Sequence, residues 1–125
     1  MKGLVARANY AACHCELECA PLPRDLPAEV ADCIWRLVDH LLQAVGREPA
    51  ARSVRLRLRV TNVHLVLEVD LASLQPLPED WRTGNVPQVL CGYALRVGGL
   101  ADVQLSGATW RFHGLLPRIP GTLGV

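Results

Sequence analysis

Several features that mark particular protein classes are scarce or missing in this sequence of 125 residues. Its 13 basic and 12 acidic side chains leave a formal net charge of +1, so no overall field draws it to nucleic acid or anionic membrane. No apolar run is long enough to span a bilayer, and residues 1–10 lack the apolar core of a signal peptide. We therefore expect a cytoplasmic protein that binds neither nucleic acid nor membrane.

We do not expect the cysteines to form a disulfide framework, because their number, five, is odd and the rest of the chain can build an ordinary core. Cys13, Cys15 and Cys19 with His14 could suggest zinc. However, no second pair of ligands follows, and strand alternation would point His14 away from the thiols. We expect buried free thiols and no metal.

Half of the residues are hydrophobic, which at this length suffices for one core and not for two. We therefore expect a single domain over residues 1–125. Its end is rich in proline and glycine, which predicts a flexible tail at residues 118–125.

The most regular stretch is the segment Pro27–Gly46, where apolar residues recur at spacings of three and four. They are Val30, Ile34, Leu37, Val38, Leu41, Leu42 and Val45. Pro27 suits the first helical position, and Gly46 is a candidate for a left-handed C-terminal cap. The pattern predicts an amphipathic helix that forms the centre of the fold.

Alternation of apolar and polar residues predicts strands around this helix. One strand is expected before the helix, at 13–19, and a first hairpin after it, at 53–60 and 64–70. A second helix is expected at 86–97, stopped by Gly98 and Gly99, and a second hairpin at 103–105 and 109–116. Residues 1–12 are expected to form a short helix or lead-in, and 71–83 a loop or lid.

This order of elements predicts an α/β fold of the α+β type. We expect a two-layer sandwich in which two main helices pack on one face of a mixed, mostly antiparallel sheet.

The order, together with particular residues, resembles the ATP-binding catalytic domain of two-component sensor histidine kinases, members of the GHKL ATPase superfamily with the Bergerat fold. The best-matching stretch is LPAEVADCIWRLVDHLLQAV followed by VRLRLRV, and the resemblance covers roughly residues 17–117. It implies a nucleotide site between the first helix and the 71–83 segment.

The same resemblance implies that the nucleotide chemistry is lost. In the family, a Glu on the first helix activates water and an Asn four residues later binds magnesium, and the matching positions here are His40 and Ala44. Asp70 matches the adenine-reading Asp, but no glycines follow it. Gly84 is what remains of the glycine-rich lid, and Thr109 of a Gly-Thr pair before the last strand. Together these five residues would be a vestigial pocket without a metal ligand or a backbone able to close on phosphate.

We therefore expect a degenerate, catalytically inactive domain without cofactor that binds a protein in signalling. The implied partner is a response regulator or a sensor kinase, and homo-oligomers are also possible. One alternative is a divergent ATP- or ADP-binding domain that uses magnesium with Asp70, Gly84 and Thr109, and another is a purely structural remnant. Under the first interpretation, Leu71, Leu74 and the proline-braced segment 76–78 should fill or cover the old nucleotide space.

A stripe of arginines on the third predicted strand has two interpretations. Its members are Arg52, Arg55, Arg57 and Arg59. A nucleic-acid surface would need aromatic side chains to stack bases, and none lies among them. Since Glu68 lies across the hairpin, we expect a solvated strand face with salt bridges.

Overall fold

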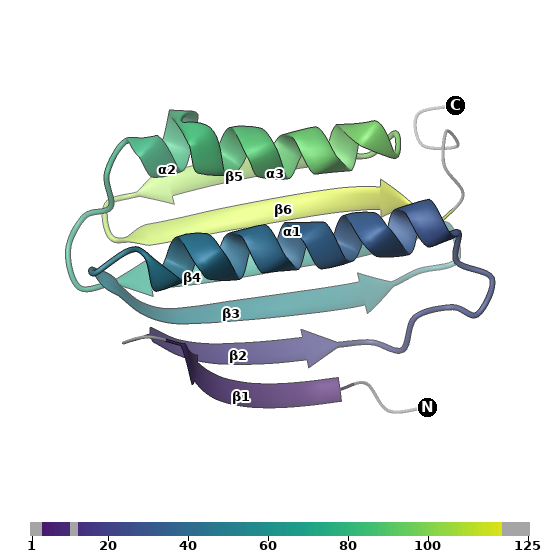
Figure 1. Ribbon diagram of the computed structural model, residues 1–125, viewed down its shortest axis with the longest axis horizontal. Coiled ribbons are helices and arrows are strands. Elements are labelled where there is room, and N and C mark those ends of the chain that lie inside the picture. The colour runs from purple at the N-terminus through teal and green to yellow at the C-terminus, as the bar shows by residue number, and fades with distance from the viewer. Residues whose placement is uncertain (1–3, 11–12, 119–125) are drawn as a thin grey trace.

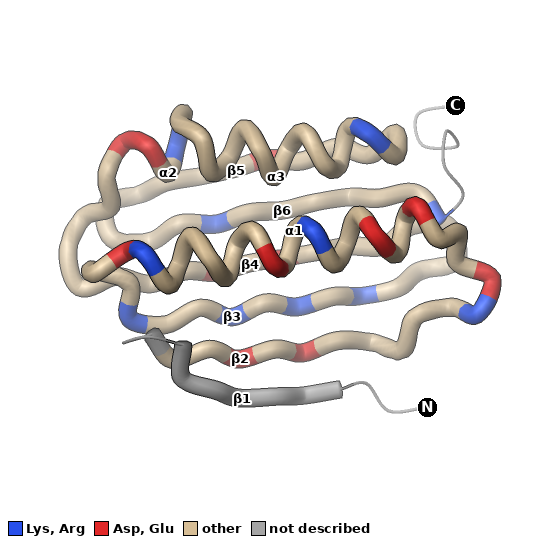
Figure 2. The backbone as a smooth tube through the Cα atoms, viewed as in Figure 1, with Lys and Arg blue, Asp and Glu red and all other residues tan. Residues whose placement is uncertain are grey.

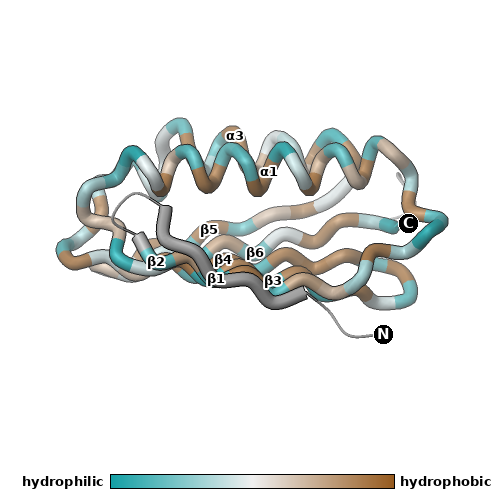
Figure 3. The backbone as a smooth tube through the Cα atoms, turned by 60° about the horizontal axis from the view of Figure 1, so that its bottom comes forward, coloured by the Kyte–Doolittle hydropathy of each residue, from teal (hydrophilic) through white to brown (hydrophobic). Residues whose placement is uncertain are grey.

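In the computed structural model, which describes residues 4–10 and 13–118, a sheet and a layer of helices lie one on the other (Figures 1 and 3). The strands are β1 (Leu4–Tyr10), β2 (Cys13–Cys19), β3 (Ala51–Val60), β4 (His64–Ser73), β5 (Leu100–Ser106) and β6 (Thr109–Pro117). The helices are α1 (Ala28–Gly46), α2 (Asp80–Thr83) and α3 (Asn85–Arg96). The strand order is β1-β2-β3-β4-β6-β5.

The sheet is mixed and mostly antiparallel, as the sequence predicts. Only β2 and β3 pair in parallel, because the chain crosses over through α1 between them. The pairs β3–β4 and β5–β6 are antiparallel hairpins. The two long helices, α1 and α3, lie on the same face, and the predicted two-layer fold is confirmed.

Helix α1 buries the predicted apolar stripe against the sheet. Its buried residues are Val30, Cys33, Ile34, Leu37, Leu41, Ala44 and Val45, while Val38 and Leu42 are half-buried. Pro27 is the N-cap. The predicted left-handed cap at Gly46 is wrong, because Gly46 stays in the helix and Arg47 ends it at φ −94°. The Arg47 N–H bonds the Gln43 and Ala44 carbonyls directly, so the turn needs no positive φ.

Residues 4–10 form a strand, and the prediction of a short helix or lead-in there is wrong. Strand β1 pairs antiparallel with β2 from Leu4 opposite Cys19 to Tyr10 opposite Cys13. On its other side β2 pairs with β3, so without β1 it would leave a row of backbone groups unpaired at the sheet edge. Strand pairing therefore outweighs the weak local pattern.

The second half of the chain follows its predicted elements closely. Helix α3 ends where Gly98 takes φ +80°, which confirms the predicted stop. A two-residue turn at Gly107 and Ala108 joins β5 to β6, and Gly107 has φ +58°. Glycine supplies both positive φ values at no steric cost.

The structure describes only Arg118 of the predicted tail, directly after the end of β6. Pro117 belongs to β6, opposite His64. Arg118 donates to the Thr61 and Asn62 carbonyls and lies 3.2 Å from a carboxylate oxygen of Asp25. Residues 119–125 of the predicted tail lie outside the described residues.

The core lies between the sheet and the two long helices. Its largest fully buried side chains are Trp110, Phe112, Leu37, Leu41, Leu65, Leu67, Leu71, Leu90 and Leu116. No polar or charged residue is buried among those that the structure describes. In the same ranges, no helix is both long and apolar enough to cross a membrane.

Candidate functional site

A groove of about 390 Å³ opens at the C-terminal end of α1, beside the junction of α2 and α3. Its lining residues are Ala44, Arg47, Glu48, Pro78, Asp80, Trp81, Asn85 and Val86. It lies on the helix side of the fold, where the first helix meets the segment predicted as a lid. This is the place in which the sequence predicts a vestigial nucleotide pocket.

The chain between β4 and α3 packs down beside this groove. Trp81 of α2 is 4 % exposed and Leu77 is 7 % exposed. The Trp81 ring meets the Trp110 ring edge to face, with centroids 5.3 Å apart, and the Trp110 Nε1–H donates to the Trp81 carbonyl at 2.6 Å. The Leu77 N–H bonds the Gly107 carbonyl in the β5–β6 turn. Leu77 and Trp81 are thus buried against the sheet beside the groove, which itself stays open.

Two details of the predicted 71–83 loop are wrong. Residues 71–73 continue β4, and residues 80–83 form α2, because Leu71 and Trp81 each bury an apolar side chain. Leu74 was expected to fill the pocket, but it is 64 % exposed. Its N–H bonds the Ala50 carbonyl, which holds the segment to the α1–β3 loop while the side chain faces solvent.

Gly84 lies between α2 and α3, where the chain has no room for a side chain. A Cβ there would approach a carboxylate oxygen of Asp80 to 1.7 Å and the Asp80 carbonyl oxygen to 2.7 Å. The same carboxylate accepts the Asn85 N–H at 3.3 Å. Gly84 therefore allows a tight junction between the helices, and this close approach explains it without any phosphate.

His40 and Ala44, one helical turn apart on α1, have different surroundings. Ala44 is 5 % exposed and lines the groove. His40 is half-buried, and its ring lies edge to face against Tyr93 of α3, with centroids 6.5 Å apart. Its Nε2 is buried and has no hydrogen-bond partner. His40 thus belongs to the contact between α1 and α3 and is not among the groove's lining residues.

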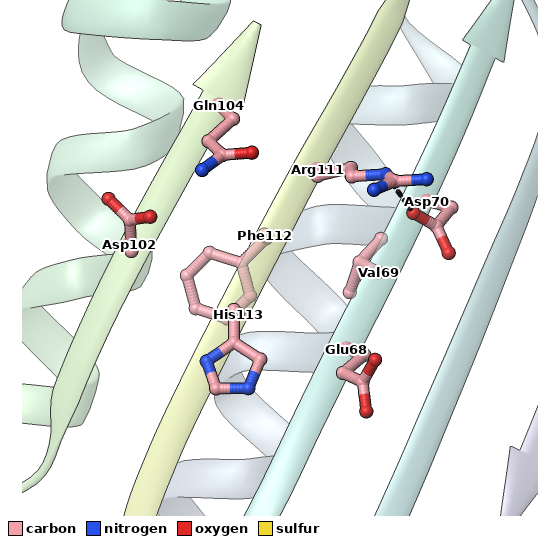
Figure 4. A pocket seen from close by; sticks show the side chains of 8 residues that line it. All are labelled: Glu68, Val69, Asp70, Asp102, Gln104, Arg111, Phe112 and His113. Carbon is pink, nitrogen blue, oxygen red and sulfur yellow. Dashed lines mark ion pairs between the residues drawn. The ribbon is translucent and has the colours of Figure 1, made fainter.

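Asp70 lies on the opposite face of the sheet from the groove, which corrects the predicted pocket. Its carboxylate pairs with Nε of Arg111 at 3.0 Å, and half of its side chain is exposed (Figure 4). The two residues line a shallow hollow of about 370 Å³, together with Glu68, Asp102 and His113. It lies on the face of the sheet opposite α1 and α3, which we call the open face. Successive strand residues point to opposite faces, so Asp70 and its buried neighbour Leu71 cannot share one.

Leu71 was expected to fill the old nucleotide space from a loop, but it continues β4 and occupies the helix-side position at the end of that strand. It is fully buried, and its strand partners are Val54 and Trp110. A signal for it was available, since the alternation through Leu65, Leu67 and Val69 continues directly to Leu71. An apolar side chain therefore stands where a carboxylate would have to face a ligand between the layers.

Thr109 also lies away from the groove. It is exposed at the start of β6 and lines a second open-face hollow with Asp70 and Arg111. The structure therefore brings only Ala44 and the Gly84 junction together at the groove. The predicted pocket is wrong for Asp70 and Thr109, because strand alternation places both on the far side of the sheet.

Three of the four arginines in the stripe pair with carboxylates across neighbouring strands, as expected. Arg55 lies 3.2 Å from Glu16, Arg57 lies 3.6 Å from Glu18, and Arg59 pairs with Glu68. Figure 2 shows the basic positions of β3 beside the acidic positions of β2. These side chains are mostly solvent-accessible, so each pair contributes little to stability, but the carboxylates offset the charge of Arg55, Arg57 and Arg59.

Of the described thiols, Cys33 is buried, whereas Cys91 and also Cys15 and Cys19, which were expected to be buried, are half-buried. Burial, with a smaller contribution from Asp32, raises the pKa of Cys33 from 9.0 to about 11, and its Sγ donates to the Tyr93 carbonyl at 3.1 Å. Burial also raises the pKa of Cys19, and that of Cys91 together with Asp102. Cys15, Cys19, Cys33 and Cys91 are not in disulfides. Across residues 4–10 and 13–118, no three His, Cys, Asp or Glu side chains are grouped so as to hold a metal ion.

Comparison with solved structures defines the fold as that of a histidine kinase ATP-binding domain. The histidine kinase domain of the Erythrobacter litoralis EL346 blue-light activated kinase superposes with a TM-score of 0.66 at 20% identity, over 85% of this chain and 52% of that one. Acinetobacter baumannii histidine kinase AdeS gives 0.62 at 15% identity, over 86% of this chain and 55% of that one.

The mycobacterial sensor histidine kinase MprB gives a TM-score of 0.59 at 16% identity, over 89% of this chain and 87% of that one. The chain spans only about half of the length of the Erythrobacter kinase domain and of AdeS. No protein-family profile and no curated protein matches the sequence. At these identities the likeness establishes the fold alone, which is that of the histidine kinase domains in these structures.

Proposed function

We propose that this chain is a degenerate histidine-kinase-like ATPase domain that does not hydrolyse ATP and acts by binding a protein in signalling. The observation that carries the proposal is that the end of β4 beside the groove presents an apolar side chain to the helix layer. There, Leu71 is buried in the core, and Asp70 is turned to the other face. A nucleotide between the layers would find no carboxylate at this position to accept hydrogen bonds from its base.

The surroundings of Ala44 support the same proposal. A methyl group cannot bind magnesium, whose ligands in proteins are oxygens. Trp81 and Leu77 hold the lid segment against the β5–β6 turn, with Trp81 bonded to Trp110. Opening this segment around a triphosphate would expose buried aromatic surface, which opposes binding.

A specific observation favours a second candidate function, the binding of ATP or ADP without the usual contacts. The groove at Ala44 persists at about 390 Å³, and Arg47 and Asn85 at its edge could contact phosphate or base. In this alternative the bound nucleotide could not use Asp70 or Thr109, because both lie on the open face of the sheet.

The test is the thermal unfolding of the protein with ATP and magnesium, and with ADP. A ligand present at about a hundred times its dissociation constant adds roughly 2.7 kcal/mol of stability. We expect no shift of the unfolding midpoint. A saturable shift that Arg47→Ala weakens would contradict the proposal and support the alternative.

The chain offers a matched control for that variant. Arg24→Ala removes another exposed arginine beyond the opposite end of α1. If both substitutions reduced a nucleotide shift equally, the binding would be a general charge effect and not a site at the groove.

The fold also supports a proposal for the class of partner. The similar solved proteins are histidine kinases, which suggests a two-component setting. We propose a response regulator or a sensor kinase as the partner, and homo-oligomers are an alternative outcome of the same binding experiments.

A further inference from the structure

The helix layer is narrower than the sheet beneath it. Helix α1 packs on β3, and α3 packs on β5 and β6. Neighbouring strands are about 4.8 Å apart and packed helices about 8–10 Å apart, so one helix covers about two strands. Six strands thus have room for three long helices, and residues 4–10 and 13–118 contain two. The remaining room is over β1 and β2, which lie to one side of α1 (Figure 1).

The helix-side face of β2 is apolar although neither α1 nor α3 covers it. Leu17 continues a row across the sheet whose next members are Leu56, Val69 and Phe112. Those three are at most 4 % exposed, but Leu17 is only half-buried. Cys15 and Cys19, two residues to either side of Leu17, are half-buried in the same way and pack on the margin of the core.

The flank of α1 on this side is also apolar. Trp35, Val38 and Leu42 follow one another at spacings of three and four, so they form one stripe. Cys33 and His40 contact Tyr93 and thereby fix the other flank of α1 against α3. The stripe therefore faces away from α3, on the side of β2. Trp35 is 67 % exposed, the highest fraction among the exposed large hydrophobic side chains of the described residues.

These two rows form one surface, which we call the α1–β2 face: Trp35, Val38 and Leu42 on α1, and Cys15, Leu17 and Cys19 on β2. Its outer border on α1 is acidic. Asp32 pairs with Arg36 at 2.6 Å, but Asp39 accepts only a neutral amide hydrogen bond, from Gln43 at 2.9 Å. The border of two carboxylates and one guanidinium thus has a net negative charge.

We propose that the α1–β2 face binds an amphipathic helix of a protein partner. The helix lies alongside α1, its apolar stripe covers Trp35 and Leu17, and its Lys or Arg side chains lie toward Asp32 and Asp39. It takes the third place in the helix layer, with an axis about 8–10 Å from that of α1. The inference rests on the proposed function, since it names the surface through which a protein-binding domain of this fold acts.

The first experiment uses a synthetic peptide as the probe. It has Leu at helical spacings of three and four on one face and Lys on the other, and is about five turns long. Trp81 and Trp110 are buried, so solvent-exposed tryptophan emission comes from Trp35. We expect a saturable blue shift at one peptide per chain, and none with a peptide of the same composition in scrambled order. Equal binding of the scrambled peptide would overturn the proposal.

The second experiment locates the binding by anisotropy of the labelled peptide. Trp35→Asp should weaken binding at least tenfold, while Leu95→Asp, which alters a 64 % exposed leucine on α3, should leave it unchanged. Equal losses in both variants would overturn the proposed site. A peptide with Glu in place of Lys should bind more weakly, and equal affinity would overturn the predicted charge complementarity.

Native thiols give a readout that needs no substitution. The bound peptide should slow alkylation of Cys15 and Cys19 by iodoacetamide, and leave the rate at Cys91 on α3 unchanged, as measured by mass spectrometry of the separated peptides. Unchanged rates at Cys15 and Cys19 under saturating peptide would contradict the proposal.

Light scattering tests the other occupant, a second copy of this chain. We expect a monomer. A dimer that Trp35→Asp converts to monomer would assign the face to self-association and overturn the helix proposal. The nucleotide test reports on the groove at Ala44 and not on this face. A nucleotide shift with intact peptide binding would therefore refute only the proposed function, and the reverse pattern would refute only this inference.

Discussion

At the scale of single residues, Trp110 holds the lid segment to the sheet. It is fully buried, its ring contacts those of Trp81 and Phe112, and its Nε1–H satisfies the Trp81 carbonyl. This one side chain therefore combines apolar burial with a hydrogen bond between β6 and α2.

We predict that Trp110→Phe lowers the free energy of unfolding by about 1–3 kcal/mol or more, because the Trp81 carbonyl loses its buried donor. Urea unfolding followed by far-UV circular dichroism measures the change. Phe112→Leu is a control that leaves this hydrogen bond in place. If Trp110→Phe were neutral, the bond would not be what holds α2 to the sheet.

Cys33 provides a prediction about pH. Its pKa is raised to about 11 in the folded protein from an ordinary 9.0, so the folded state keeps the thiol protonated while the unfolded chain ionises. The stability that the protonated Cys33 thiol contributes is fully present below pH 9 and is lost as the pH rises from about 9 to about 11. The loss is on the order of 2–3 kcal/mol.

The measurement compares unfolding free energies of the protein and of Cys33→Ala from pH 8 to about pH 11. All other side chains are the same in both proteins, so the difference isolates the thiol. We expect the two curves to converge with rising pH. Parallel curves would contradict the raised pKa.

Residue-level prediction from the sequence was weakest where one position decides the face of a strand. Asp70 attracted attention as the carboxylate that a nucleotide site would need, but the alternation of β4 assigns that side to Leu71. A shift by one residue moves a side chain through the sheet. The alternation of apolar and polar residues in β4 predicts which face each side chain takes. The resemblance of Asp70 to a motif residue does not.

At the scale of elements, α1 is the helix that both the pattern and the structure make central. The sequence predicted its bounds to within one residue, as well as the two hairpins and the stop of α3 at Gly98. These elements have strong periodicity or a glycine that the turn requires. β1 was missed, because its stability comes from pairing with β2, which no local pattern in residues 1–12 reveals.

We predict that Ile34→Ala and Leu37→Ala each lower the free energy of unfolding by about 2–5 kcal/mol, since both side chains are at most 5 % exposed against the sheet. Chemical denaturation measures the loss. Trp35→Ala is a matched control on the same helix, where an exposed side chain should change stability by about 0.5 kcal/mol or less. Comparable losses in all three variants would mean that α1 faces the sheet differently.

At the scale of the whole molecule, the sheet has a strong centre and weaker margins. Strand β4 is paired on both sides, with β3 and β6, and its inward residues Leu65, Leu67, Val69 and Leu71 are at most 2 % exposed. Strand β5 is an edge whose side chains are exposed or half-buried. The same contrast separates β3 from β2, whose helix side is covered by neither α1 nor α3.

This contrast predicts the pattern of amide hydrogen exchange, and with it the domain organisation. Opening β4 disrupts the core on both sides, so its amides should exchange only through global unfolding, with a free energy equal to that from denaturant. Amides of β5 should exchange through smaller openings at lower free energy, because releasing an edge strand exposes little core. Hydrogen exchange with mass spectrometry resolves the strands.

If β3–β4 and β5–β6 instead opened as two units, each with its own free energy, the single domain predicted for residues 1–125 would be wrong. A single slowest class across β3, β4, β6 and the buried side of α1 is expected, because these elements share one core and none can leave without exposing the others.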